Sequence, residues 1–211
     1  MTTRTTLLVT ALGLSVATTL QAEAATTLAT EQGFAYWLAR GTVLHGWALA
    51  MQGQAEQGIA EMRQGLAADL ATGAKVMQPY YLGLLAEAYG EGGHPEEGLP
   101  LLAEALAVMD NTELRYYGAE LYRLKGALLL RQAVPDASQA EACFHQALDV
   151  ARAQQAKSLE LRAAISLARL WQQQDKHQDA RDLIAPVYDW FTEGFDTVDL
   201  QEAKALLKAL M

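Results

Sequence analysis

The chain has 211 residues, 51% of them apolar, which is enough to bury a substantial core. Its 16 Lys and Arg against 25 Asp and Glu give a net charge of −9, which argues against nucleic acid as a partner because binding a phosphate backbone requires a basic face. Alanine, leucine, glutamine and glutamate dominate and prolines number only 5, so we expect an all-α fold of long helices.

Residues 1–30 are open to two interpretations. Arg4, the apolar stretch from Leu7 to Ala17 and the small residues Ala22 and Ala24 match a secretory signal, and cleavage after Ala24 would make the protein exported. Threonines and a glycine dilute the apolar stretch, however, which is also shorter than the about 20 residues of a membrane span. We therefore expect an N-terminal helix or degenerate repeat, no membrane span and a cytoplasmic location.

A small–large–turn–small–large–small pattern then recurs along the chain. The first small residue of each copy is Gly46, Ala86, Gly126 or Ala168, at spacings of 40, 40 and 42 residues, and the later small position holds Gly58, Gly98, Ala140 or Ala180. Small residues let two antiparallel helices approach closely, and the large residues between them fill the remaining space. This is the pattern of a tetratricopeptide (TPR) repeat.

We therefore expect an α-α superhelix of about four TPR-like hairpins. The predicted solenoid domain is residues 31–211, with repeats at about 35–74, 76–111, 113–156 and 158–193 and a capping helix at 197–210. Pro95 and Pro135 lie near the start of second helices, where proline is tolerated. The spacing exceeds the usual length of about 34 residues, which predicts longer helices or looser linkers.

Whole phrases of the chain resemble a known family. These are HGWALAMQGQAEQGIAEMRQGLA, PYYLGLLAEAYGEGGHPEEGL, ELYRLKGALLL, AEACFHQALDVARAQQAKSLELRAAISLARLW and WFTEGFDTVDLQEAKALL. From about Ala29 onward the chain resembles the C-terminal TPR region of bacterial signalling proteins that join a class III nucleotide cyclase domain to a STAND-type ATPase domain. The resemblance implies a module that senses or binds partners, with an ATPase or cyclase domain encoded upstream as one candidate partner.

The sequence carries no pattern of an enzyme or a metal site. It has no G-x-x-x-x-G-K-[ST] phosphate loop, and its histidines (His45, His94, His145 and His177) belong to no H-E-x-x-H or Cys/His motif. We interpret Cys143 as a small buried side chain, because a nucleophile needs a paired base. We expect no catalytic residue, no metal and no cofactor; an active site in the groove, the alternative, would require titratable groups with mutually perturbed pKa values.

Large aromatic residues and surface carboxylates have structural interpretations. The aromatic residues expected in the core are Trp171, Trp190, Tyr81, Tyr116 and Tyr117. The carboxylates Glu96, Glu97, Glu104, Asp179 and Asp182 lie near turns, where helix ends and a solvated face explain them.

The first helix of each TPR repeat lines the concave groove of the superhelix. The residues predicted to bind a protein or peptide there are Arg40, Trp47, Tyr80, Glu87, Arg123, Arg131, Arg162 and Arg169. Guanidinium forks suit carboxylates, so the four arginines of the last two repeats predict an acidic or C-terminal peptide as ligand. The alternative is that they pair with Glu120 and Glu160 as ordinary salt bridges. We expect a non-catalytic binding scaffold or sensor; the main rival is an exported TPR binding protein.

Overall fold

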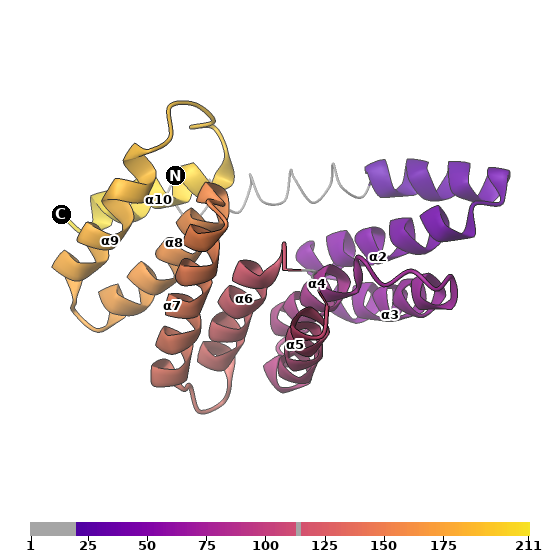
Figure 1. Cartoon of the computed structure of the whole chain (residues 1–211), viewed down its shortest axis with the longest axis horizontal. Helices are drawn as coiled ribbons and strands as arrows, with labels where there is room; N and C mark the ends of the chain where they lie inside the picture. Colours follow the sequence, from indigo (N-terminus) through magenta and orange to yellow (C-terminus); the bar gives the residue numbers. More distant parts are fainter. Residues whose placement is uncertain (1–19, 113–114) are drawn as a thin grey trace. The chain divides into compact units, whose positions relative to one another are not determined.

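The computed structural model describes residues 20–112 and 115–211, which form helices and turns without strands (Figure 1). These residues divide into an N-terminal unit, residues 20–112 and 115, and a C-terminal unit, residues 116–211. In both units successive helices pack against their neighbours in the chain. The predicted fold class, an all-α solenoid of helical hairpins, is confirmed. None of the helices in the described ranges is both long and apolar enough to cross a bilayer.

The N-terminal unit begins with a helical segment at residues 20–32. It continues with α2 (Ala35–Met51), α3 (Ala55–Ala71), α4 (Gln78–Glu91) and α5 (Pro95–Asp110). Helices α2 and α3 form one hairpin and α4 and α5 the next, and α4 also packs against both helices of the first hairpin. Residues 1–19 lie outside the described residues, so most of the signal-like segment predicted from the sequence lies outside them too.

The C-terminal unit contains α6 (Gly118–Arg131), α7 (Ala137–Ala153), α8 (Lys157–Gln173), α9 (His177–Asp189) and α10 (Val198–Ala209). Helices α6 and α7 form a hairpin, α8 and α9 form another, and α10 packs against α8 and α9. One hairpin therefore overlaps each predicted repeat range, with α8 beginning one residue before position 158, and α10 lies within residues 197–210. The division of the chain into a segment at 1–30 and one domain at 31–211 stays a prediction.

Small residues sit where the helices of a hairpin touch. A Cβ added to Gly46 on α2 would lie 2.6 Å from the carbonyl oxygen of Gly58 on α3, and one added to Gly65 would lie 2.8 Å from the backbone nitrogen of Val43. The large positions of the pattern, Met62, Leu102, Phe144 and Ile184, are fully buried. The predicted register is therefore the packing register of the hairpins.

The turns within hairpins differ between the two units. Gly53 and Gly93, which follow α2 and α4, have φ of +88° and +81°, a left-handed conformation that glycine adopts without steric cost. In the C-terminal unit Asp175, in the turn between α8 and α9, takes this conformation instead, with φ of 60°. Gln155, with φ of 54°, does so in the connection between the two hairpins of that unit. Pro95 opens α5, while Pro135 lies two residues before α7.

Candidate functional site

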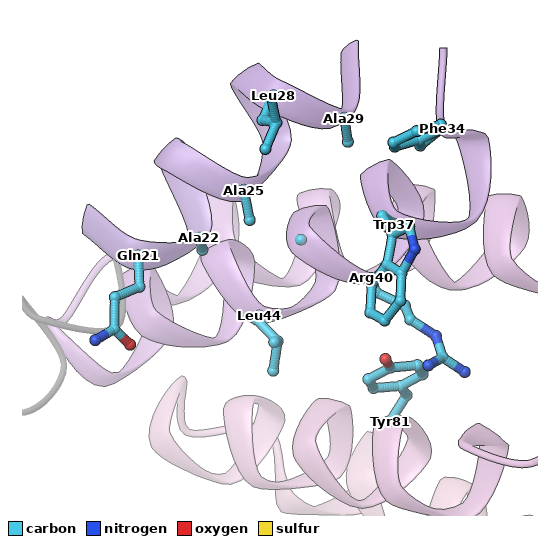
Figure 2. A pocket seen from close by; sticks show the side chains of 11 residues that line it. Gln21, Ala22, Ala25, Leu28, Ala29, Phe34, Trp37, Arg40, Leu44 and Tyr81 are labelled. Carbon is cyan, nitrogen blue, oxygen red and sulfur yellow. The ribbon is translucent and has the colours of Figure 1, made fainter. Parts of the chain in front are cut away.

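An apolar pocket of about 540 Å³ opens in the N-terminal unit between the helix at residues 20–32, α2 and the start of α4 (Figure 2). It is lined by Gln21, Ala22, Ala25, Leu28, Ala29, Phe34, Trp37, Arg40, Gly41, Leu44 and Tyr81. Figure 2 shows Trp37, Arg40 and Tyr81 grouped at one end of this pocket and Gln21 at the other. The volume lies within the range of about 300–1,000 Å³ that is typical of ligand sites.

The rim of the pocket is an exposed apolar patch. The side chains of Leu28, Phe34 and Trp37 are 58%, 53% and 59% exposed, and all three line the pocket. We call these three residues the apolar rim. Large apolar side chains exposed beside a cavity are typical of interaction sites.

Close packing of small residues places one wall of the pocket. Ala22 and Ala29 are buried, and a Cβ added to Gly41 of α2 would lie 2.5 Å from the Thr26 methyl carbon. The backbone N–H of Phe34 donates to the carbonyl oxygen of Ala29 across the turn, at 2.8 Å. The absence of a side chain at Gly41 therefore lets residues 20–32 lie directly on α2.

Arg40 supplies the positive charge of the pocket. Its Nε donates to Oδ1 of Asp69 on α3 at a long 3.4 Å, and its guanidinium carbon stacks 3.8 Å from the ring centroid of Tyr36. The side chain is only 15% exposed. Among the residues that the structure describes, the guanidinium has no other hydrogen-bond partner, so most of its N–H donors remain available.

Two buried polar side chains lie beside this guanidinium. Asp69 is fully buried, and within the described chain its Oδ2 has no hydrogen-bond partner. Burial raises the pKa of Tyr81 well above its ordinary value; the Asp69 charge adds to this rise and the Arg40 charge opposes it. Tyr81 therefore stays neutral at physiological pH, and the Arg40–Asp69 pair is held by one long contact.

In the C-terminal unit the predicted arginines surround a buried carboxylate. Glu120 is 2% exposed; it accepts hydrogen bonds from Nε and Nη2 of Arg123 at 2.9 and 2.8 Å, and its Oε1 lies 2.8 Å from Nη1 of Arg162. Burial acts to raise the pKa of Glu120, but the charge and hydrogen bonds of Arg123 and the charge of Arg162 together lower it below its ordinary value. Glu120 is therefore ionised and fully matched.

Helix α10 supplies carboxylates to the same arginines. Arg162 Nε lies 3.7 Å from Oδ1 of Asp199, and Arg169 forms an ion pair with Glu202.

The other predicted arginine of this unit, Arg131, lies in the last turn of α6. Glu160 pairs with Arg152 and Lys157 at 2.9 and 2.7 Å. Arg123 and Arg162 thus pair with Glu120, as the salt-bridge alternative expected, whereas Glu160 pairs with other residues. Peptide binding by the arginines stays a prediction.

The remaining predicted residues belong to the N-terminal unit. Trp47 Nε1 donates to Oε2 of Glu87 at 2.9 Å, joining α2 to α4, and Tyr80 lies beside Tyr81 with ring centroids 5.4 Å apart. Of the predicted residues only Arg40 lines the pocket. The structure therefore groups the predicted residues into separate sets, one in each unit.

The sequence-based prediction missed most of the pocket. Leu28, Phe34, Trp37 and Leu44 line it and were not predicted as binding residues. A signal was present, because Phe34 and Trp37 are large aromatic residues close before Arg40. Core positions for Trp190 and Tyr116 were also predicted and are wrong: their side chains are 58% and 43% exposed because they lie in connecting turns.

The candidate catalytic and metal-binding residues have ordinary surroundings. His45 Nδ1 lies 2.6 Å from Oε2 of Glu61, and its Nε2 lies 3.6 Å from Glu23. Cys143 is half-buried, and burial raises the pKa of its thiol, which disfavours the nucleophilic thiolate. In the described ranges no cluster of three or more His, Cys, Asp or Glu side chains is arranged to hold a metal ion.

Comparison with known proteins found no matching family model and no matching curated protein.

Proposed function

We propose that this chain is a non-catalytic module that binds another protein or a peptide, and that the pocket of the N-terminal unit with its apolar rim is a main contact surface. The observation that carries this proposal is the exposure of Leu28, Phe34 and Trp37, each more than half exposed, around an apolar cavity. Aromatic and aliphatic side chains gathered in this way are the usual anchors of protein interfaces. Stacked helical hairpins are a common scaffold for such surfaces.

The chemistry of the described side chains favours binding over catalysis. An active site needs titratable groups that converge on a substrate and perturb one another. The pocket is lined mainly by apolar groups, with Gln21, Arg40 and Tyr81 as its polar members. The carboxylates with lowered pKa, Glu120 and Glu160, are matched by arginine and lysine partners instead. A non-enzymatic role is therefore the simpler proposal.

The cellular context that we propose is bacterial signalling in the cytoplasm, with an ATPase or cyclase domain encoded upstream as a candidate partner. Its support is the resemblance of the repeat phrases to the TPR region of nucleotide cyclase and STAND-type ATPase proteins. The rival is an exported binding protein. Mass spectrometry of the mature amino terminus decides between them, because cleavage after Ala24 would establish export.

A second candidate surface is the arginine face of α6 and α8. Arg162 and Arg169 are 37% and 52% exposed, and Asp199 lies 3.7 Å from Arg162. A peptide carboxylate could take the place of such a loosely held partner, because exposed ion pairs contribute little free energy. Replacing Arg123 and Arg169 with alanine and screening acidic peptides tests this candidate; unchanged capture would remove it.

Capture of partners from the native cell tests the main proposal. We would use the full chain as bait, with Leu28→Glu as the disrupting variant and Leu70→Glu as its matched control. Leu70 is 41% exposed and does not line the pocket. We expect partners that bind the wild type and Leu70→Glu but not Leu28→Glu, and the interaction is then repeated with the purified partner. Identical captures by all baits would contradict a role for the pocket.

A further inference from the structure

The repeat register explains the position of the pocket. On α2 its lining residues are Trp37, Arg40, Gly41 and Leu44. The residues 40 positions later are Met77, Tyr80, Tyr81 and Leu84. All four of these later residues belong to the hydrophobic cluster that α4 forms with Val43, Leu44 and Trp47 of α2. The face of α4 that is equivalent to the pocket face of α2 is therefore covered by α2, the first helix of the preceding hairpin.

The other wall of the pocket shows the same equivalence. Ala22, Ala25 and Ala29 lie 40 positions before Met62, Gly65 and Asp69 of α3. Those three α3 residues face α2: Met62 lies against Gly46, Gly65 against Val43, and Asp69 against Arg40. Both walls thus correspond to surfaces that α2 occupies in the following repeat. The pocket therefore lies where a further first helix would pack, as α2 packs against α3 and α4.

The charges point to the chemistry of the helix that would fit. Arg162 occupies the same repeat position as Arg40, six residues before the small residues Ala168 and Gly46, respectively. Arg162 is neutralised by Glu120 of the preceding first helix at 2.8 Å. Arg40 has only the long 3.4 Å contact to Asp69, and the described residues offer its guanidinium no further hydrogen-bond acceptor. A carboxylate is therefore the complementary group.

We propose that the pocket binds an amphipathic helix of a partner polypeptide, which packs its apolar face on Leu28, Phe34 and Trp37 and brings one Glu or Asp side chain to Arg40. This occupant rests on the proposed protein-binding function and gives it a ligand class. Recognition follows the helix-in-groove mode, in which apolar anchors recur at i, i+3, i+4 and i+7. The carboxylate forms charge-assisted hydrogen bonds with the guanidinium and fixes the register of the helix.

A peptide with the sequence of α6 is a suitable probe, because Glu120 of α6 pairs with Arg162, the residue equivalent to Arg40. The probe is a fluorescein-labelled peptide of residues 118–131, and its matched control is the same peptide with Glu120→Gln. We expect saturable binding to the full chain by fluorescence anisotropy. Affinity is expected to be weak, since short helices are marginal in water and must be ordered on binding. The Gln peptide should bind about tenfold more weakly through loss of one charge-assisted contact.

Protein variants locate the binding to the pocket. Leu28→Glu should weaken binding of the wild-type peptide by about tenfold or more, because it removes an apolar contact and repels the carboxylate. Leu70→Glu should leave binding unchanged. Arg40→Gln should abolish the difference between the two peptides. If Arg40→Gln does not fold, as judged by circular dichroism, the Leu28→Glu and Leu70→Glu pair still decides the outcome, since both positions are exposed.

The failures of the two proposals are distinguishable. Absence of saturable binding up to about 1 mM peptide, or equal binding of the two peptides, overturns the acidic helix as occupant. If a native partner is nevertheless lost with Leu28→Glu, protein binding stands and only the helix chemistry is wrong. Self-association of the chain that Leu28→Glu abolishes, measured by analytical ultracentrifugation, would make a second copy the occupant and also overturn this proposal.

Discussion

The two units handle an equivalent arginine in different ways. In the C-terminal unit Arg162 shares the buried Glu120 with Arg123, so the carboxylate accepts contacts of 2.8–2.9 Å on both oxygens. In the N-terminal unit Arg40 meets Asp69, whose second oxygen has no hydrogen-bond partner in the described chain. One position of the repeat therefore supports a closed ion-pair network in one unit and borders an apolar pocket in the other.

Within a repeat, the residues that set helix packing differ from the residues that vary between repeats and form its surfaces. The small positions and the large positions Met62, Leu102, Phe144 and Ile184 are buried in both units. The residue six before the first small position is instead Arg, Tyr, Glu and Arg in the successive hairpins. Packing positions set how helices approach, because interiors tolerate little change of volume. Variable positions on the same helices decide which surfaces are matched internally and which remain available to a partner.

The largest predicted effect concerns the glycines of the hairpins. A Cβ at Gly58 would overlap the backbone oxygen of Gly46, whereas a Cβ at Gly126 would first meet the Phe144 ring, at 2.5 Å. A ring can shift but a helix backbone cannot do so without separating the hairpin. We expect Gly58→Ala to reduce the free energy of unfolding by about 3 kcal/mol and Gly126→Ala by about 1–2 kcal/mol. Urea denaturation followed by circular dichroism measures both, and equal losses would contradict the argument.

The two buried carboxylates provide the next comparison. Glu120→Gln should destabilise the C-terminal unit by about 3 kcal/mol, because it leaves Arg123 and Arg162 without their shared negative charge. Asp69→Asn should change the free energy of unfolding by about 1 kcal/mol or less, since the neutral side chain is cheaper to bury and only one long contact weakens. Denaturation curves of the two variants test this order. A larger loss for Asp69→Asn would show that its pair with Arg40 is the stronger one.

Lowering the pH should reproduce part of the Glu120 effect. Its folded pKa is lowered from the ordinary value of 4.5, so its stabilising contribution is fully present above that pH and is lost as the pH falls toward the folded pKa. The stability difference between wild type and Glu120→Gln should therefore be constant from pH 7 to about pH 5 and shrink by about 1 kcal/mol or more below pH 4. Thermal denaturation at stepped pH measures it; a difference that grows on acidification would reverse the sign.

Much of the fold was predictable from sequence because its signal is local and repeated. The spacing of Gly46, Ala86, Gly126 and Ala168 places each hairpin, and small residues there have one structural reason, the close approach of two helices. The pairing of Glu120 with arginines was also available as an alternative, since Arg123 follows it by three residues on one helix and Arg162 lies on the first helix of the next repeat. The burial of Glu120 could not be read from the pattern, and peptide binding by these arginines stays a prediction.

The pocket could not be predicted because it depends on a helix with a weak repeat pattern. Of the residues in register there, only Ala25 fits its expected type well, whereas Ala22 is small where a large residue is expected. Ala22 lines the pocket, whereas the residue 40 positions later, Met62, is a large side chain that is fully buried. A mismatch to the repeat was therefore the signal for the site. The predicted core positions of Trp190 and Tyr116 were wrong because an aromatic side chain alone does not establish that a residue is buried.

The smallest predicted effect compares helix starts in the two units. Asp136 caps α7 by accepting a hydrogen bond from the backbone N–H of Gln139 at 2.8 Å, whereas Gln54, at the equivalent place before α3, makes no side-chain cap. A capping carboxylate satisfies one of the free N–H groups at a helix start, and its negative charge interacts favourably with the positive end of the helix dipole. Asp136→Ala should therefore cost about 1 kcal/mol, and Gln54→Ala less than about 0.5 kcal/mol. Thermal unfolding of the full chain resolves this difference, and equal midpoints for the two variants would show that the Asp136 contact adds nothing to the stability of the α6–α7 hairpin.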